Sequence, residues 1–82
     1  MDYVLTLHAR ERMKERSITK ALFEDALRNP TKIGYDRDGK ILLKKIYTKK
    51  KVTRLLLIVG ETRGSVFNVI TIIETSKVEK YL

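Results

Sequence analysis

The amino-acid sequence predicts an α+β domain in which an N-terminal helical hairpin packs on a four-stranded antiparallel meander sheet. Three observations lead to this prediction. Apolar residues before residue 30 recur at four-residue spacing, as on one face of a helix. From residue 32 onward, β-forming residues dominate in runs that are separated by short polar turns. The chain has 82 residues, enough for one hydrophobic core and too few for two, so residues 1–82 are expected to form a single domain.

Two short helices are expected at the start of the chain. The first runs from about residue 7 to 16, and Thr6 is placed to cap its N-terminus. Its apolar edge is formed by Leu5, Ala9 and Met13. Thr19 is placed to cap a second helix, which ends at Asn29 because Pro30 disfavours helical geometry in the residue before it. The two helices therefore form a hairpin with a short connection.

Four strands are expected to follow. Turn-forming or charged stretches, "DRDG" (36–39), "KKK" (49–51) and "ETRGS" (61–65), delimit strands at about 32–35, 41–48, 52–60 and 66–74. Such short connections favour sequential antiparallel pairing. Ser76 and Glu79 have the spacing of a capping box, so a short C-terminal helix is expected after the last strand.

The positive charge of the chain is concentrated in its middle third. The net charge is +8, and residues 32–54 alone hold nine lysines and arginines against two acids. A concentrated positive field attracts polyanions, so this segment indicates a nucleic acid or an acidic protein as partner. The alternative is that the charge serves only solubility.

Several classes of protein do not fit the sequence. The chain contains no cysteine, which excludes disulfides and thiolate metal sites. Neither a signal peptide nor a run of about 18 apolar residues is present, so we expect a cytoplasmic protein with no membrane contact. The nearest approach to a metal-binding carboxylate cluster, Asp36 and Asp38 before Gly39, has the composition of a tight turn, so we expect neither a metal site nor a cofactor.

The first helix carries a stripe of residues suited to RNA cleavage. The candidate catalytic residues His8, Arg12 and Arg16 are spaced four apart. A neutral imidazole can accept the proton of a ribose 2′-hydroxyl, while guanidinium groups stabilise the charge that grows on the phosphate. The alternative is structural: Glu11 and Glu15 can pair with nearby cations on the helix surface, and His8 can bond a backbone carbonyl.

The hairpin between the second and third expected strands carries the candidate RNA-binding residues. They are Lys44, Lys45, Lys49, Lys50, Lys51 and Arg54. Phosphate contacts from such residues position RNA without reading its bases. Lys44 and Lys45 are adjacent on a strand and point to opposite faces, so only one of them can share a site with Arg54. Tyr35, Tyr47 and Tyr81 could stack on bases or act as weak acids, but each is expected more often in the core or at its rim.

Nearly the whole chain resembles a widespread uncharacterised family of short prokaryotic proteins. The resemblance is carried by "HARERMKERSI" (8–18), "ALRNP" (26–30) and "VITII" (69–73). More distantly, the order of two helices, an antiparallel sheet and a basic surface is similar to the RelE and BrnT toxins of toxin–antitoxin modules. The last strand departs from the BrnT pattern, because Thr71 and Glu74 stand where an arginine is usual and Lys77 is the only nearby cation.

This resemblance implies a RelE-like toxin, a metal-independent endoribonuclease that cleaves messenger RNA. Its partners would be RNA, including RNA on the ribosome, and a cognate acidic antitoxin; a homodimer is also compatible with the sequence. Two alternatives stay open. The chain could bind RNA or ribosomes without cleavage, or it could act as a toxin on a protein target such as gyrase.

Overall fold

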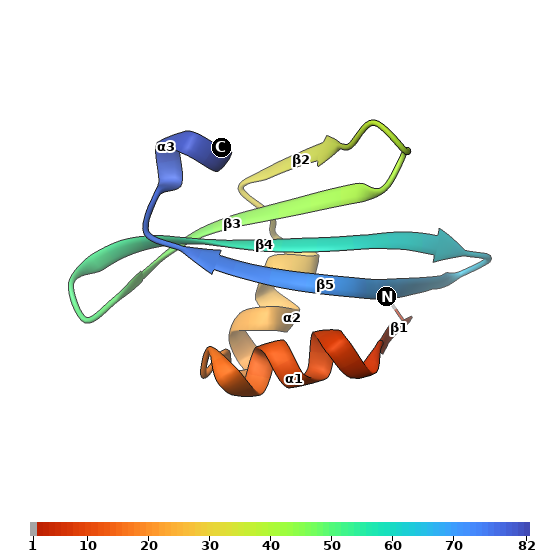
Figure 1. The fold of residues 1–82 in the computed structure, drawn as a ribbon, viewed down its shortest axis with the longest axis horizontal. Helices are drawn as coiled ribbons and strands as arrows, with labels where there is room; N and C mark the ends of the chain where they lie inside the picture. The colour runs from red at the N-terminus through yellow and green to blue at the C-terminus, as the bar shows by residue number, and fades with distance from the viewer. Residues whose placement is uncertain (1) are drawn as a thin grey trace.

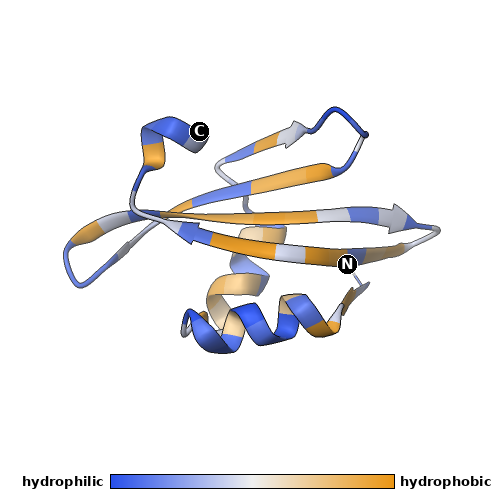
Figure 2. Cartoon of the chain, viewed as in Figure 1, coloured by the Kyte–Doolittle hydropathy of each residue, from blue (hydrophilic) through white to orange (hydrophobic). Residues whose placement is uncertain are grey.

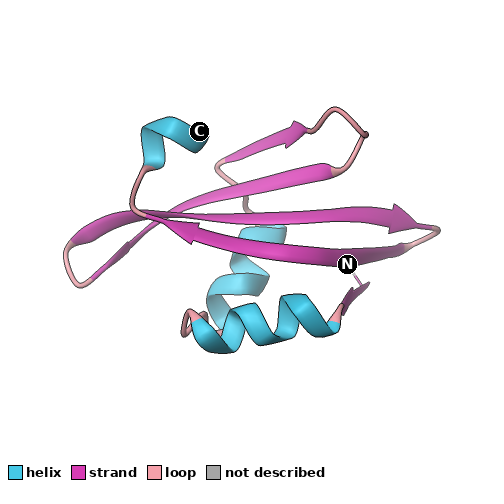
Figure 3. Ribbon diagram, in the orientation of Figure 1, coloured by secondary structure: helices cyan, strands magenta, loops and turns pink. Residues whose placement is uncertain are grey.

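The computed structural model describes residues 2–82, which form three helices and one mixed five-stranded sheet (Figures 1 and 3). In chain order the elements are β1 (Asp2–Leu5), α1 (Leu7–Glu15), α2 (Lys20–Arg28), β2 (Lys32–Tyr35), β3 (Ile41–Lys49), β4 (Val52–Arg63), β5 (Val66–Thr75) and α3 (Val78–Tyr81). The α+β class and the four expected strands are confirmed. In this part of the chain, no helix has the length and apolar character that crossing a membrane requires.

The expectation of a four-stranded antiparallel meander is wrong in one respect, because the start of the chain adds a fifth strand. The strand order is β1-β5-β4-β3-β2, and β1 pairs in parallel with β5, with Asp2 opposite Val66 and Leu5 opposite Val69. The other pairs are antiparallel, as expected. A parallel partner more than 60 residues away leaves no turn signal in the sequence beside β1.

Both helices of the hairpin begin at the expected caps. The side chain of Thr6 accepts a hydrogen bond from the backbone of Ala9 at 3.1 Å, and that of Thr19 accepts one from Leu22 at 3.1 Å. Helix α1 ends through a backbone bond from Ile18 N to the carbonyl oxygen of Met13, at 2.9 Å. This 6→1 bond requires a left-handed residue just before Ile18. The chain places Ser17 there, with φ of +52°.

The core lies between the helical hairpin and one face of the sheet. Its fully buried members include Phe23 from α2, Leu56 and Ile58 from β4, and Ile72 from β5. Figure 2 shows that the apolar residues run along the middle of the strands, whereas the β3–β4 hairpin is hydrophilic toward its tip. The middle of the sheet therefore packs against the helices, whereas the tip of the β3–β4 hairpin does not contribute to the core.

The other face of the sheet is partly covered by α3. Leu55 points away from the helical hairpin by strand alternation and is nevertheless fully buried, and α3 contacts β4. The expected capping box at Ser76 is wrong. The residue before α3 is Lys77, and no side chain caps the helix. Thr75 Oγ1 accepts the backbone N–H of Lys77 at 3.0 Å.

A register shift between β4 and β5 brings the two backbones close together at Gly60. The pairing shifts between Val59 and Gly60. A Cβ at Gly60 would lie 2.5 Å from both the ring of Phe67 and the backbone oxygen of Asn68. Only glycine fits this close approach, so Gly60 is required for the shifted pairing of β4 with β5.

Candidate functional site: a cleft beside the lysine hairpin

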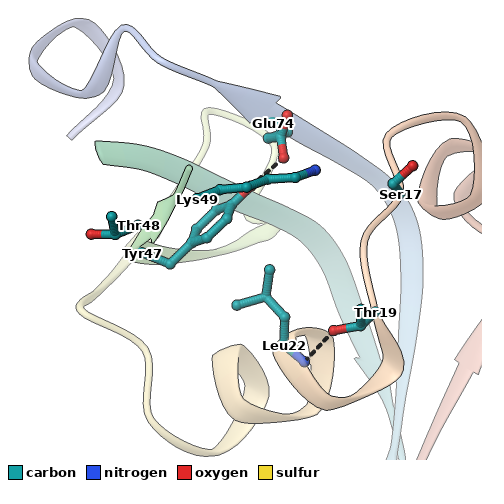
Figure 4. A pocket seen from close by; sticks show the side chains of 7 residues that line it. All are labelled: Ser17, Thr19, Leu22, Tyr47, Thr48, Lys49 and Glu74. Atoms are coloured by element: carbon teal, nitrogen blue, oxygen red, sulfur yellow. Dashed lines mark hydrogen bonds between the residues drawn. The ribbon is translucent and has the colours of Figure 1, made fainter. Parts of the chain in front are cut away.

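A cleft of about 320 Å³ opens at the end of the molecule that carries the β3–β4 hairpin. The turn between α1 and α2 lies at the same end (Figure 1). The cleft is lined by Ser17, Thr19, Leu22, Tyr47, Thr48, Lys49 and Glu74, which Figure 4 shows together. Three separate parts of the chain therefore form it: the start of the second helix, the end of β3 and the end of β5.

One of the lining residues is a carboxylate that is held almost out of solvent. Only 9% of the Glu74 side chain is exposed. The hydroxyl of Tyr47 donates a hydrogen bond to Glu74 Oε2, and Arg54 Nη1 lies 3.4 Å from Oε1. Tyr47 and Arg54 are directly opposite each other on β3 and β4, so their side chains reach Glu74 on the same face of the sheet.

The phenol of Tyr47 is kept protonated by this arrangement. Burial raises the pKa of Tyr47 above its ordinary value, and the hydrogen bond to Glu74 and the negative charge of that carboxylate raise it further. Tyr47 therefore acts as a fixed donor that orients the carboxylate. Arg54 supplies a positive charge beside the Glu74 carboxylate.

Strained and unsatisfied groups gather around this cleft. Within residues 2–82, the only non-glycine residues with positive φ are Ser17, which lines the cleft, and Lys50 and Lys51, which follow the lining residue Lys49. Each such residue costs about 1 kcal/mol or more relative to ordinary backbone. The only buried side-chain nitrogen or oxygen without a hydrogen bond in the same range is Nε of Arg54. The left-handed geometry of Ser17 serves to end α1, whereas strained lysines and an unsatisfied guanidinium nitrogen are features that cluster at functional sites.

The helix stripe predicted to be catalytic lies beside the cleft and does not line it. His8 is exposed, and its Nε2 lies 3.0 Å from Thr71 Oγ1 on β5. Arg12 is half-buried, and Arg16 is exposed where α1 ends, one residue before Ser17. The histidine thus contacts a strand side chain rather than the backbone carbonyl of the structural alternative.

Two of the predicted RNA-binding lysines lie away from the cleft. Lys45 reaches beneath α2, where its Nζ lies 3.1 Å from Asp25 Oδ2 and donates to the carbonyl oxygen of Asn29 at 2.8 Å. A hydrogen bond from Asn29, and then one from Lys45, lowers the pKa of the Asp25 carboxyl. Lys44 points to the opposite face, directly across from Lys32 on β2. Lys45 is the one that shares a face with Arg54, and acceptors on α2 already occupy it.

The remaining predicted cations do come together. Lys49 lines the cleft, Lys50 and Lys51 are exposed at the hairpin tip next to it, and Arg54 pairs with the carboxylate inside. We call Lys49, Lys50 and Lys51 the lysine tip. This arrangement can bind a polyanion at the tip, next to a cleft whose carboxylate is paired with the guanidinium of Arg54.

Sequence reasoning missed the central residue of this site. Glu74 appeared only as a departure from the toxin pattern, although a single acid near the end of an otherwise apolar strand was a signal for a buried ion pair. Thr71, the second departure, is the residue that holds His8. Among residues 2–82, no three His, Cys, Asp or Glu side chains gather as a metal site would require.

Comparison with known proteins places the chain in one family. No curated protein and no solved structure shows significant similarity to it. The model of the domain of unknown function DUF4258 matches residues 5–80, which include both helices of the hairpin, most of the sheet and every residue of the cleft. The chain therefore belongs to the DUF4258 family.

Proposed function

We propose that this protein is a metal-independent endoribonuclease of RelE-like type, and that the cleft beside the lysine tip is its active site. The observation that carries the proposal is the Glu74 carboxylate, only 9% exposed and held by Tyr47 and Arg54 at the strained, cationic end of the molecule. A carboxylate beside fixed cations is what metal-independent cleavage of RNA needs.

In this proposal, Glu74 accepts the proton of a ribose 2′-hydroxyl. The 2′-oxygen then attacks the adjacent phosphorus, and the bond from phosphorus to the 5′-oxygen of the next nucleotide breaks. The leaving oxygen takes a proton from the ammonium group of Lys49 or from water. The products are a 2′,3′-cyclic phosphate and a free 5′-hydroxyl, so atoms and charge balance. Arg54 stabilises the negative charge that grows on the phosphate.

The proposal moves the proton acceptor from the helix to the sheet. His8 was the acceptor that the sequence indicated, but it lies against Thr71 and outside the cleft. Glu74 lines the cleft together with a cation. Arg12 and Arg16 keep a supporting role on the RNA path along α1, because phosphate contacts position the strand without taking part in the chemistry.

The test is cleavage of a labelled single-stranded RNA by the purified protein in the presence of a metal chelator. We expect products that end in a 2′,3′-cyclic phosphate. Glu74→Gln keeps the size of the side chain and removes the base, so it should slow cleavage by about 10² to 10⁴-fold. The matched control is Glu79→Gln on α3, an exposed carboxylate outside the cleft, which should cleave like the wild type. His8→Gln should lose far less than Glu74→Gln.

A second candidate function is RNA binding without cleavage. The observation in its favour is that both oxygens of Glu74 already have partners, Tyr47 and Arg54. Tight, salt-sensitive binding of RNA by folded protein with no product after long incubation would support this candidate and contradict the ribonuclease. Cleavage at the same rate by Glu74→Gln would contradict the role of Glu74.

We also propose that the protein is a toxin and that an acidic antitoxin inhibits its activity. Within residues 2–82, the lysines of the tip form no ion pair, so they give an acidic partner a surface to cover, and the RNA would compete for the same charges. Expression of the chain alone should arrest growth and fragment messenger RNA, and Glu74→Gln should abolish both effects. Normal growth with intact transcripts at confirmed expression would contradict the toxin.

A further inference from the structure

We infer that the cleft receives a single unpaired nucleobase, so that the substrate is single-stranded RNA and not a duplex. This inference rests on the proposed function, because it requires RNA at the lysine tip. It adds what enters the cleft, which the mechanism above leaves open.

The first argument is the shape of the cleft. Its volume of about 320 Å³ is at the lower end of sites that enclose a small organic group. The side chain of Leu22 points from α2 toward the ring of Tyr47 on β3 (Figure 4). The Tyr47 ring is fixed because its hydroxyl is bonded to Glu74. An apolar side chain and a rigid aromatic ring together offer walls for a flat group.

The second argument is the chemistry around those walls. The hydroxyls of Ser17 and Thr19 also line the cleft and can bond the edge of a base, whereas Glu74 is left for the ribose hydroxyl. A nucleobase has this division of character, since its faces stack on aromatic rings and its edges carry hydrogen-bonding groups. An aliphatic ligand would leave these hydroxyls unused.

The third argument is the position of the lysine tip. Lys49 is at the same time a lining residue of the cleft and the first residue of the tip, so phosphates bound at Lys50 and Lys51 adjoin the entrance. One base can enter while its own backbone stays on the lysines. A base within a duplex is paired and stacked, and it must be unpaired before it can enter.

The first experiment measures binding of three RNA ligands to the wild-type protein at one salt concentration. The ligands are a single strand, the same strand in a duplex, and a strand of equal length whose sugars carry no bases. We expect the baseless strand and the duplex to bind about tenfold more weakly than the single strand, as loss of one stacked base predicts. Equal affinity for the single strand and the baseless strand would overturn the inference, because charge alone would then explain binding.

A pair of variants tests whether the base binds in the cleft beside Leu22. Leu22→Trp fills the cleft, whereas Ala21→Trp adds the same side chain at the exposed neighbouring position of α2. Leu22→Trp should lose the preference for the single strand over the baseless strand, and Ala21→Trp should keep it. Retention of the preference by folded Leu22→Trp would overturn the inference. If Leu22→Trp fails to fold, the wild-type comparison of the three ligands still decides.

The two levels of the proposal fail in different ways. If the wild type binds none of the RNA ligands, the proposed function itself is wrong. If it binds and cleaves the single strand and the duplex equally well, the ribonuclease stands and only the nucleobase inference is lost.

Discussion

The turns at the two ends of the sheet use different residues at their left-handed positions. At one end, the β2–β3 and β4–β5 turns place glycine in the left-handed region, with φ of +83° at Gly39 and +63° at Gly64. The β3–β4 turn at the other end has the same need, since a two-residue hairpin loop of this type requires positive φ at both positions. Here the chain has Lys50 and Lys51, with φ of +51° and +65°.

This difference indicates that the β3–β4 turn is less stable than the two turns that contain glycine. The β2–β3 turn is also satisfied by local bonds, because Asp36 Oδ1 accepts the backbone N–H groups of Asp38 and Lys40 at 2.9 and 2.8 Å. The lysine turn combines backbone strain with adjacent positive charges that repel each other. Strain of this kind persists where another requirement maintains it, and a bound polyanion would supply one.

The largest effect is expected for a glycine that is required by packing rather than by φ. Gly60→Ala should lower the free energy of unfolding by about 3 kcal/mol, because the new methyl group meets the Phe67 ring and the Asn68 backbone. Chemical denaturation measures this loss. Gly34→Ala is the matched control, since no atom lies within 4 Å of its Cβ position, and it should lose little. Equal losses in both variants would contradict the close approach at Gly60.

The next largest effect tests the lysine turn directly. Replacing Lys50 by Asn and Lys51 by Gly should raise the free energy of unfolding by about 1.5 kcal/mol, because these residues accept left-handed geometry. The same double variant should bind single-stranded RNA more weakly. The slope of log affinity against log salt should become shallower by about 1.4, as the loss of two phosphate contacts predicts.

The control for this variant removes two charges from the opposite end of the sheet. Arg37→Gln combined with Arg63→Gln changes the net charge equally, at the β2–β3 and β4–β5 turns (Figure 1). Its salt slope should stay close to that of the wild type. If both double variants change the slope alike, RNA binding follows the total charge and not the lysine tip.

A smaller effect is expected at the turn that already has the suitable residue. Gly64→Ala should lower the free energy of unfolding by about 1 kcal/mol, because the methyl group meets no neighbour but the positive φ disfavours it. RNA affinity should not change. A stability change of the same sign in Gly64→Ala and in the double variant at Lys50 and Lys51 would contradict the comparison of the two ends.

The smallest effect appears only in alkaline solution. The pKa of Tyr47 is raised in the folded protein, so as the pH passes about 10 the unfolded chain releases this proton first. The contribution of Tyr47 to stability is therefore complete below that pH and falls above it. The difference in unfolding free energy between the wild type and Tyr47→Phe should shrink between about pH 9 and pH 11. A difference that stays constant with pH would contradict the buried hydrogen bond to Glu74.

The parts of the fold that could be predicted are those with local signals. Thr6 and Thr19 mark the N-termini of the two helices, and Pro30 marks the end of the second. Turn residues separate the antiparallel strands. The missed strand β1 has its partner at the far end of the sequence, and its four residues carry no turn beside them. Ser76 had the right spacing for a capping box, but Thr75 provides the nearby bond instead.

The site was harder to predict for a related reason. The lysine tip could be read from the sequence because its residues are consecutive. The contact of Tyr47 and Arg54 with Glu74 depends on strand register across three strands, which spacing along the chain does not reveal. His8 and Arg12 lie on one helix as expected, whereas Arg16 is the C-cap just after its last residue. The relation of these residues to the cleft depends on how α1 packs along β5.

The pairing of β1 with β5 has a consequence for the newly made chain. The helical hairpin is translated before strands β2 to β5, yet its helix α1 packs along β5. Because contacts between distant parts of the sequence form slowly, the domain can close only after the residues around Val66 have emerged. Until then the helices have no partner surface, so chains truncated before β5 should aggregate or be degraded instead of accumulating as a folded fragment.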